Sequence, residues 1–70
     1  MKRKGWSKGG GQRWERHDAL ACVYGINRAW KGYAYQGGQV IHARDDEGET
    51  LRFTSADAAA AYIDRTWPAV

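Results

Sequence analysis

The amino-acid sequence predicts an α+β fold in which an antiparallel meander of three or four strands is followed by one C-terminal α-helix packed on one face. Three features predict it: a helix start before an alanine-rich run, a Gly-Gly pair between two strand-like segments, and a second glycine-containing turn. The chain has 70 residues, which fits a single domain with a thin core. A domain of this size buries only about 60% of the surface that its unfolded chain exposes.

The C-terminal segment carries the clearest pattern. Thr54-Ser55-Ala56-Asp57 offers a capping hydroxyl with a carboxylate three positions on, and strong helix formers follow. We therefore expect a helix over residues 55–66, ended by Pro68. Apolar side chains recur at helical spacing and should face the sheet: Ala56, Ala59, Ala60, Ile63 and Trp67.

The pair Gly37-Gly38 predicts a tight hairpin, because glycine adopts the positive φ angles of a two-residue turn. This turn fixes the register of the segments on either side. It places Tyr35 opposite Val40 and Tyr33 opposite His42.

Two further strands should complete the meander. A turn at Asp46-Glu47-Gly48 would return the chain so that Phe53 lies opposite Ile41. An earlier strand over about residues 19–24 should pair with residues 29–35 across Gly25-Ile26-Asn27, and its start lies near Trp14 or near Ala19.

The alternation of side chains then divides the sheet into two faces. The inner face, against the helix, should hold Leu20, Cys22, Trp30, Gly32, Ala34, Ile41, Ala43, Leu51 and Phe53. The outer face should hold Lys31, Tyr33, Tyr35, His42, Arg44 and Arg52, with Val40 as its aliphatic member.

Positive charge is concentrated at the N-terminus. Residues 1–16 carry six basic side chains and one acidic, a net +5, whereas the remaining residues carry five basic and seven acidic, a net −2. Residues 1–12 are rich in Lys, Arg and Gly and lack apolar periodicity, so we expect a disordered basic arm before a domain at residues 13–70. Such an arm would attract an anion or serve only as a solubilising tail.

The outer face and the arm together suggest a non-catalytic nucleic-acid-binding module. Aromatic rings stack on bases for about 1–3 kcal/mol each, and cations neutralise phosphates. The candidate contacts to DNA or RNA are Lys2, Arg3, Lys4, Lys8, Arg13, Lys31, Tyr33, Tyr35, His42, Arg44 and Arg52. Trp6 and Trp14 would help the arm to wrap a strand.

The same outer face also suits a protein-interaction module, because exposed aromatic patches often mark interfaces. Trp6 and Trp14 could fold back over it, or a second copy of the chain could cover it in a homodimer. A small basic phage or mobile-element protein that binds a host factor would have a similar sequence.

Other function classes find little support in the sequence. One cysteine, Cys22, cannot form a disulfide scaffold or a four-ligand zinc site, so we expect it to be buried and inert in a cytoplasmic protein. His17 and His42 lack a metal-ligand spacing, and Gly9-Gly10-Gly11 lacks the context of a phosphate-binding loop. We expect no enzyme activity, cofactor, metal, signal peptide or membrane span.

The run Phe53-Thr54-Ser55-Ala56-Asp57-Ala58-Ala59-Ala60 resembles the sheet-to-helix junction of the plant ethylene-response-factor type of DNA-binding domain. It is similar to the junction in phage integrase arm-binding domains, and the order of elements resembles single-stranded-DNA-binding coactivators. The first resemblance implies a sheet that enters the major groove. It assigns no contact residue, because the Arg- and Trp-rich first strands of that family have no counterpart here.

Overall fold

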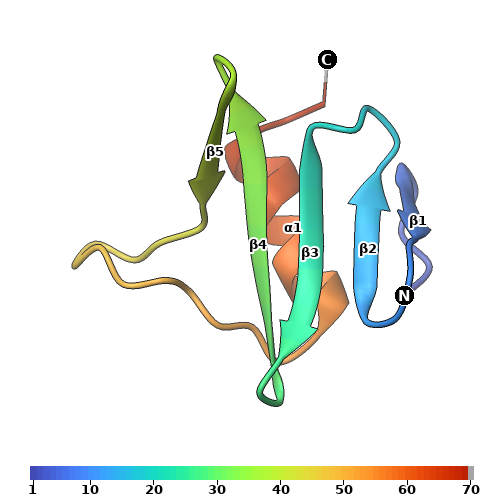
Figure 1. Cartoon of the computed structure of the whole chain (residues 1–70), viewed down its shortest axis with the longest axis horizontal. Helices are drawn as coiled ribbons and strands as arrows, with labels where there is room; N and C mark the ends of the chain where they lie inside the picture. Colours follow the sequence, from blue (N-terminus) through green and yellow to red (C-terminus); the bar gives the residue numbers. More distant parts are fainter. Residues whose placement is uncertain (70) are drawn as a thin grey trace.

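The computed structural model describes residues 1–69 and shows a five-stranded antiparallel sheet with one helix packed behind it (Figure 1). The strands are β1 (Trp6–Lys8), β2 (Arg13–Arg16), β3 (Ala21–Ile26), β4 (Ala29–Gln36) and β5 (Gln39–His42), and the helix is α1 (Ala56–Thr66). The strands lie in chain order across the sheet. The predicted α+β meander with a C-terminal helix is confirmed, with one strand more than the expected maximum.

Both central hairpins turn through two residues. Gly37 and Gly38 have φ angles of 58° and 80°, as a type I′ turn requires, and Tyr33 lies opposite His42 as predicted. The β3–β4 turn is Asn27-Arg28, also with two positive φ angles of 51° and 63°. The sequence predicted this turn at Gly25-Ile26-Asn27, but Gly25 and Ile26 still pair with β4 as part of β3, so the turn begins at Asn27.

The N-terminal residues do not form the expected disordered arm. Trp6–Lys8 pair with β2 as strand β1, and Trp6 is only 6% exposed. Its indole Nε1 donates to Asp64 Oδ2 at 3.0 Å, and Arg3 Nε donates to the same oxygen at 2.8 Å. Composition alone predicted disorder, whereas burial of one large indole and pairing of the nearby charge stabilise the strand.

The expected last strand is also wrong beyond its turn. Arg44 and Thr50 form the bridge that the predicted register requires, but Phe53 pairs with Trp30 instead of Ile41. The two backbone hydrogen bonds between Phe53 and Trp30 measure 2.8 and 2.9 Å. Because β4 extends beyond β5, its free stretch accepts the returning chain, and Phe53 then packs against the core.

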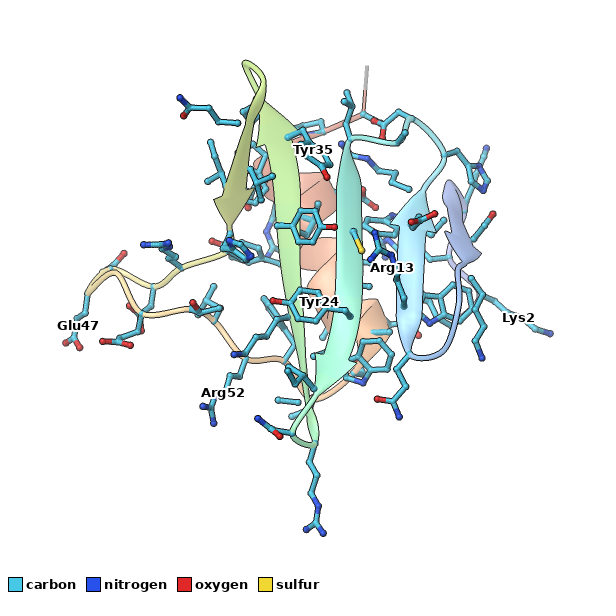
Figure 2. The ribbon with its side chains drawn as sticks, viewed as in Figure 1. Lys2, Arg13, Tyr24, Tyr35, Glu47 and Arg52 are labelled. Carbon is cyan, nitrogen blue, oxygen red and sulfur yellow. The ribbon has the colours of Figure 1, made fainter. Side chains whose placement is uncertain are left out.

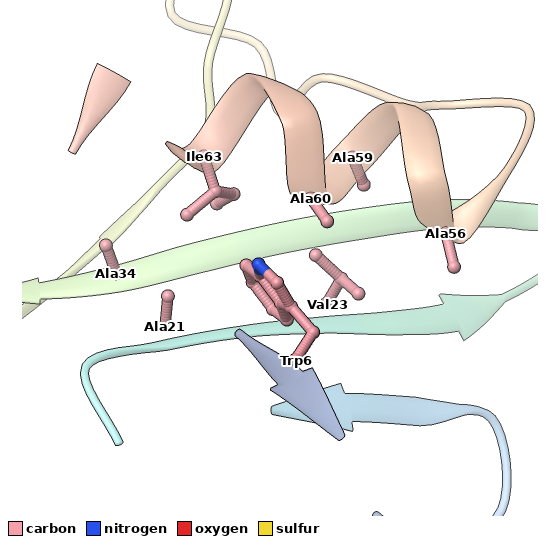
Figure 3. Packing of buried hydrophobic residues seen from close by; sticks show 8 residues of the cluster. All are labelled: Trp6, Ala21, Val23, Ala34, Ala56, Ala59, Ala60 and Ile63. Atoms are coloured by element: carbon pink, nitrogen blue, oxygen red, sulfur yellow. The ribbon is translucent and has the colours of Figure 1, made fainter. Parts of the chain in front are cut away.

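The core lies between α1 and the inner face of β3 and β4. Figure 3 shows Val23 and Trp6 of the sheet beside Ala60 and Ile63 of the helix. Small side chains in both layers allow close approach, and the remaining members of the cluster are Ala21, Ala34, Ala56 and Ala59. The predicted helical stripe is thereby confirmed, with Trp67 partly buried. The observed N-cap is Ser55, whose Oγ accepts from Ala58 N at 3.1 Å.

Two predicted inner-face residues lie elsewhere. Cys22 stands opposite Tyr33 on the face away from α1, while Ala21 and Val23 point inward. Leu20 precedes β3 and is 39% exposed, whereas Ile41 lies opposite Ala34 on the side of α1, as predicted, although it is also 39% exposed. Residues 20–23 are apolar at odd and even positions alike, so the sequence does not determine the phase of β3.

Candidate functional site

One face of the sheet is covered by α1, and no other element of residues 1–69 covers the opposite face, here called the open face (Figure 2). It faces the viewer in Figure 2, with the helix behind. The strand registers place on it Arg13, Glu15, Cys22, Tyr24, Lys31, Tyr33, Tyr35, Val40 and His42.

Four rings gather on the open face and are here called the aromatic row. Tyr33 lies at the centre, and the other three rings contact it. The Tyr33 ring centroid lies 6.1 Å from that of Tyr24, 5.7 Å from Tyr35 and 5.5 Å from His42. All three pairs are tilted or edge-on, the geometry that aromatic side chains prefer. The row is therefore preformed, and its most exposed tyrosine is Tyr35, at 39%.

Arg13 reaches the aromatic row from β2 across β3. Its Nη2 donates to the Tyr33 hydroxyl oxygen at 3.3 Å, and its Nε donates to Glu15 Oε1 at 3.0 Å. Both side chains of the ion pair are about half exposed, so the pair contributes little to stability. Arg13 therefore presents a positive charge beside the central ring.

The groups beneath this charge are neutral at pH 7. Burial, together with the neighbouring Cys22 thiol, raises the pKa of Tyr33 to about 12. Burial also raises the pKa of Cys22, despite the opposing effects of Tyr33 and Arg13. The thiol therefore stays protonated, and the charges at this end of the open face are those of Arg13 and Glu15.

The other predicted cations lie either near the aromatic row or at the N-terminus. Lys31 lies on the open face, and the antiparallel bridge between Trp30 and Phe53 places Arg52 opposite it at the edge of β4. Arg44 is exposed in the segment that follows β5. Lys31 thus lies beside the aromatic row on β4, opposite Tyr24, whereas Arg13 reaches the row from β2.

The N-terminal candidates do not join this face. Arg3 pairs with Asp64 near the helix, and Lys8 lies opposite Trp14, whose side chain packs against the core. Lys2 and Lys4 are exposed near the β1 edge. The structure thus brings together Arg13, Lys31, Tyr33, Tyr35 and His42, and leaves the four N-terminal residues outside.

A second charged cluster ties the sheet to α1. Arg16 is 5% exposed; its Nη1 donates to Asp64 Oδ1 at 3.1 Å and to the Trp67 carbonyl at 2.7 Å. Its Nε donates to Asp18 Oδ1 at 3.0 Å. Burial alone would raise the pKa of Asp64, but hydrogen bonds from Arg3, Trp6 and Arg16 outweigh it and lower that pKa. These groups bond to one another, apart from Asp18 Oδ2, which is buried without a hydrogen-bond partner among residues 1–69, so the cluster is structural.

Sequence reasoning missed Glu15, Tyr24 and Cys22 as members of the open face. Residues 13–16 are Arg-Trp-Glu-Arg, and in this short, charged run the sequence left open whether the first strand begins near Trp14 or near Ala19. The alternation of Trp14 against its charged neighbours was the available clue.

Two kinds of site are absent from the part of the chain that the structure describes. No three His, Cys, Asp or Glu residues among positions 1–69 gather so as to hold a metal ion. Likewise, none of the described helices has the length and apolarity needed to cross a membrane.

Comparison of the chain with protein-family models, curated proteins and solved structures finds no match. Function must therefore be argued from the geometry of the open face.

Proposed function

We propose that the protein is a non-catalytic nucleic-acid-binding module whose binding surface is the open face. The observation that carries this proposal is the preformed aromatic row around Tyr33, uncovered and accompanied by cations. Arg13 reaches it from β2, and Lys31, opposite Tyr24 on β4, lies beside it with Arg52. Rings and cations together suit a nucleic acid strand, because its bases stack on the rings and the cations neutralise its phosphates.

The roles of these groups differ. Tyr35 offers the most accessible tyrosine ring for stacking, which contributes about 1–3 kcal/mol per base. Tyr33 is held by its neighbours and by Arg13, so it positions the row. Arg13, Lys31 and Arg52 supply phosphate contacts, whose strength falls as salt rises.

The N-terminal cations play a smaller part in this proposal than the sequence suggested. Arg3 is engaged with Asp64, and β1 is a fixed strand that does not wrap a ligand. Lys2 and Lys4 remain exposed, and together with a net charge of +3 they add long-range attraction to a polyanion.

A protein-interaction function is the second proposal, and a separate observation favours it. Val40, on the edge strand β5, is 48% exposed and lies opposite Tyr35. Leu20, also exposed, lies on the other side of Tyr35, whose N–H donates to the Leu20 carbonyl at 2.8 Å. An apolar side chain on an unpaired strand edge suits addition of a strand from a second copy or from another protein.

The first proposal is tested by titrating the protein into fluorescently labelled short single- and double-stranded oligonucleotides at low and moderate salt, followed by fluorescence anisotropy. We expect salt-dependent binding that weakens in both Tyr35→Ala and Arg13→Gln. Arg65→Gln is the matched control, because it removes the same charge from the exposed end of α1. Absence of binding at low salt would reject nucleic acid as the ligand.

The second proposal is tested by solution mass. A concentration-dependent dimer that Val40→Lys converts to monomer would support pairing of two copies through β5. A monomer at all concentrations would remove the homodimer.

A further inference from the structure

A groove crosses the open face over β3. Its volume of about 360 Å³ lies at the lower end of the range of small-ligand sites, about 300–1,000 Å³. Tyr33 and Tyr35 line one side, Arg13 and Glu15 line the other, and Cys22 is buried between them. Figure 2 shows Arg13 and Tyr35 on opposite sides of β3.

The two sides of the groove differ in chemistry. The β4 side is formed by tyrosine rings, whereas the β2 side presents a guanidinium and a carboxylate. Farther along the polar side, Ser7 Oγ and His17 Nε2 are hydrogen-bonded at 2.6 Å. A flat group with an apolar face and a polar edge complements such a groove, and a nucleobase is a group of that kind.

Glu15 is the residue that indicates what part of a nucleic acid enters. A carboxylate repels phosphate, so it weakens a surface that binds only the nucleic acid backbone. Here its Oε1 accepts from Arg13, and no side chain among residues 1–69 donates a hydrogen bond to its Oε2. Arg13 likewise uses Nε and Nη2 within the protein and keeps further N–H groups for a ligand. The groove therefore offers an acceptor beside a donor.

This pair of groups matches one base better than the others. The Watson–Crick edge of guanine carries two adjacent N–H donors next to a carbonyl oxygen. A carboxylate accepts from both donors, and a neighbouring guanidinium donates to the carbonyl. Uracil and thymine offer one N–H between two carbonyls, and adenine and cytosine offer an amino group beside a ring acceptor. Each of these leaves a group of the groove unpaired.

Building on the proposed function, we infer that this groove holds one unpaired base and favours guanine, with the base against Tyr35 and its Watson–Crick edge toward Glu15 and Arg13. In a duplex that edge is already occupied by the complementary base. The inference therefore also assigns the module a preference for single strands.

The test compares fluorescently labelled oligothymidine with the same strand carrying one central dG, dC or dA. We expect the dG strand to bind about 10-fold more tightly than oligothymidine, within the discrimination typical of a bidentate base contact. In Glu15→Gln this preference should vanish while salt-dependent binding of oligothymidine persists. Glu49→Gln removes an exposed carboxylate of the loop before Thr50 and should retain the preference. Unchanged thermal unfolding of Glu15→Gln shows that the fold is intact.

The outcomes separate the two claims. Equal binding of all four strands, a preference for another base, or a guanine preference that Glu15→Gln retains would each overturn the groove assignment and leave the open face as a general binding surface. No binding of any strand at low salt would reject the proposed function, and the groove assignment with it.

Discussion

Arg13 and Arg16 leave the same strand, β2, on opposite faces of the sheet and have opposite roles. Arg16 is nearly inaccessible, and its guanidinium is bonded to Asp18, Asp64 and the Trp67 carbonyl. Arg13 is about half exposed and bonds to Glu15 and Tyr33, with N–H groups left over. An arginine whose donors are satisfied inside the protein stabilises the fold, whereas one with free donors can bind a ligand.

The contrast extends to the two faces of the sheet. The face beneath α1 holds small apolar side chains and the indole of Trp6. The open face holds rings, charges and the groove. Substitutions on the first face should therefore change stability without a direct effect on binding, and substitutions on the second should do the reverse.

The largest expected effect is that of Trp6→Ala. Removing a buried indole from a thin core should lower the free energy of unfolding by about 3–5 kcal/mol, measured by urea denaturation. Lys8→Ala, on the same strand but exposed, should change it by less than about 0.5 kcal/mol. If Trp6→Ala had the same free energy of unfolding as the wild type, β1 would not be part of the core.

Arg16→Ala should follow, with a loss of about 3 kcal/mol, because it leaves Asp18 and Asp64 partly buried without their shared partner. Arg13→Ala should leave the unfolding free energy nearly unchanged, because its ion pair with Glu15 is exposed. Urea denaturation of both variants measures the comparison directly. Equal losses in the two would remove the distinction between the faces.

Gly32→Ala should cost about 1–3 kcal/mol through overpacking. A Cβ at Gly32 would lie 2.9 Å from Ile63 Cδ1 and 3.2 Å from Val23 Cγ1. Ile63→Val removes that Cδ1, so the double variant should lose less than the sum of the two single losses. Strict additivity in a double-mutant cycle would show that β4 and α1 do not approach so closely.

The smallest effect should appear in acid. The pKa of Asp64 is lowered below its ordinary 3.8, so its carboxylate adds stability above that pH, and this stability is lost as the pH falls through the folded-state pKa. Melting temperatures between about pH 2 and pH 5 should show the decline. Asp64→Asn should flatten it only in part, because the pKa of Asp18 is lowered as well. An unchanged acid profile in Asp64→Asn would contradict the structural role of the cluster.

The parts of the fold that the sequence predicted are those with local signals. Gly37-Gly38 requires positive φ angles, and the alanine run after Ser55 has helical spacing, so the hairpin and helix followed from neighbouring residues. The register of Tyr33 with His42 came with the turn. This much placed most of the aromatic row correctly.

The parts that it missed depend on contacts between distant residues. Trp6 is in the core because Asp64, 58 positions away, accepts its indole N–H. Phe53 pairs with Trp30 because β4 is longer than β5 and leaves a free stretch, and no local sequence pattern predicts this difference in length. The phase of β3 was ambiguous, so Cys22 was assigned to the wrong face and the groove above it could not be foreseen.

The most direct test of the central claim is a two-dimensional NMR titration of the protein with a short single-stranded oligonucleotide at low salt. The two faces predict opposite responses. Resonances of Tyr24, Tyr33, Tyr35, His42 and Arg13 should shift, while those of Ala59 and Ala60 beneath the sheet stay in place. Shifts confined to α1, or to Lys2 and Lys4 at the N-terminus, would contradict the assignment of the open face as the binding surface.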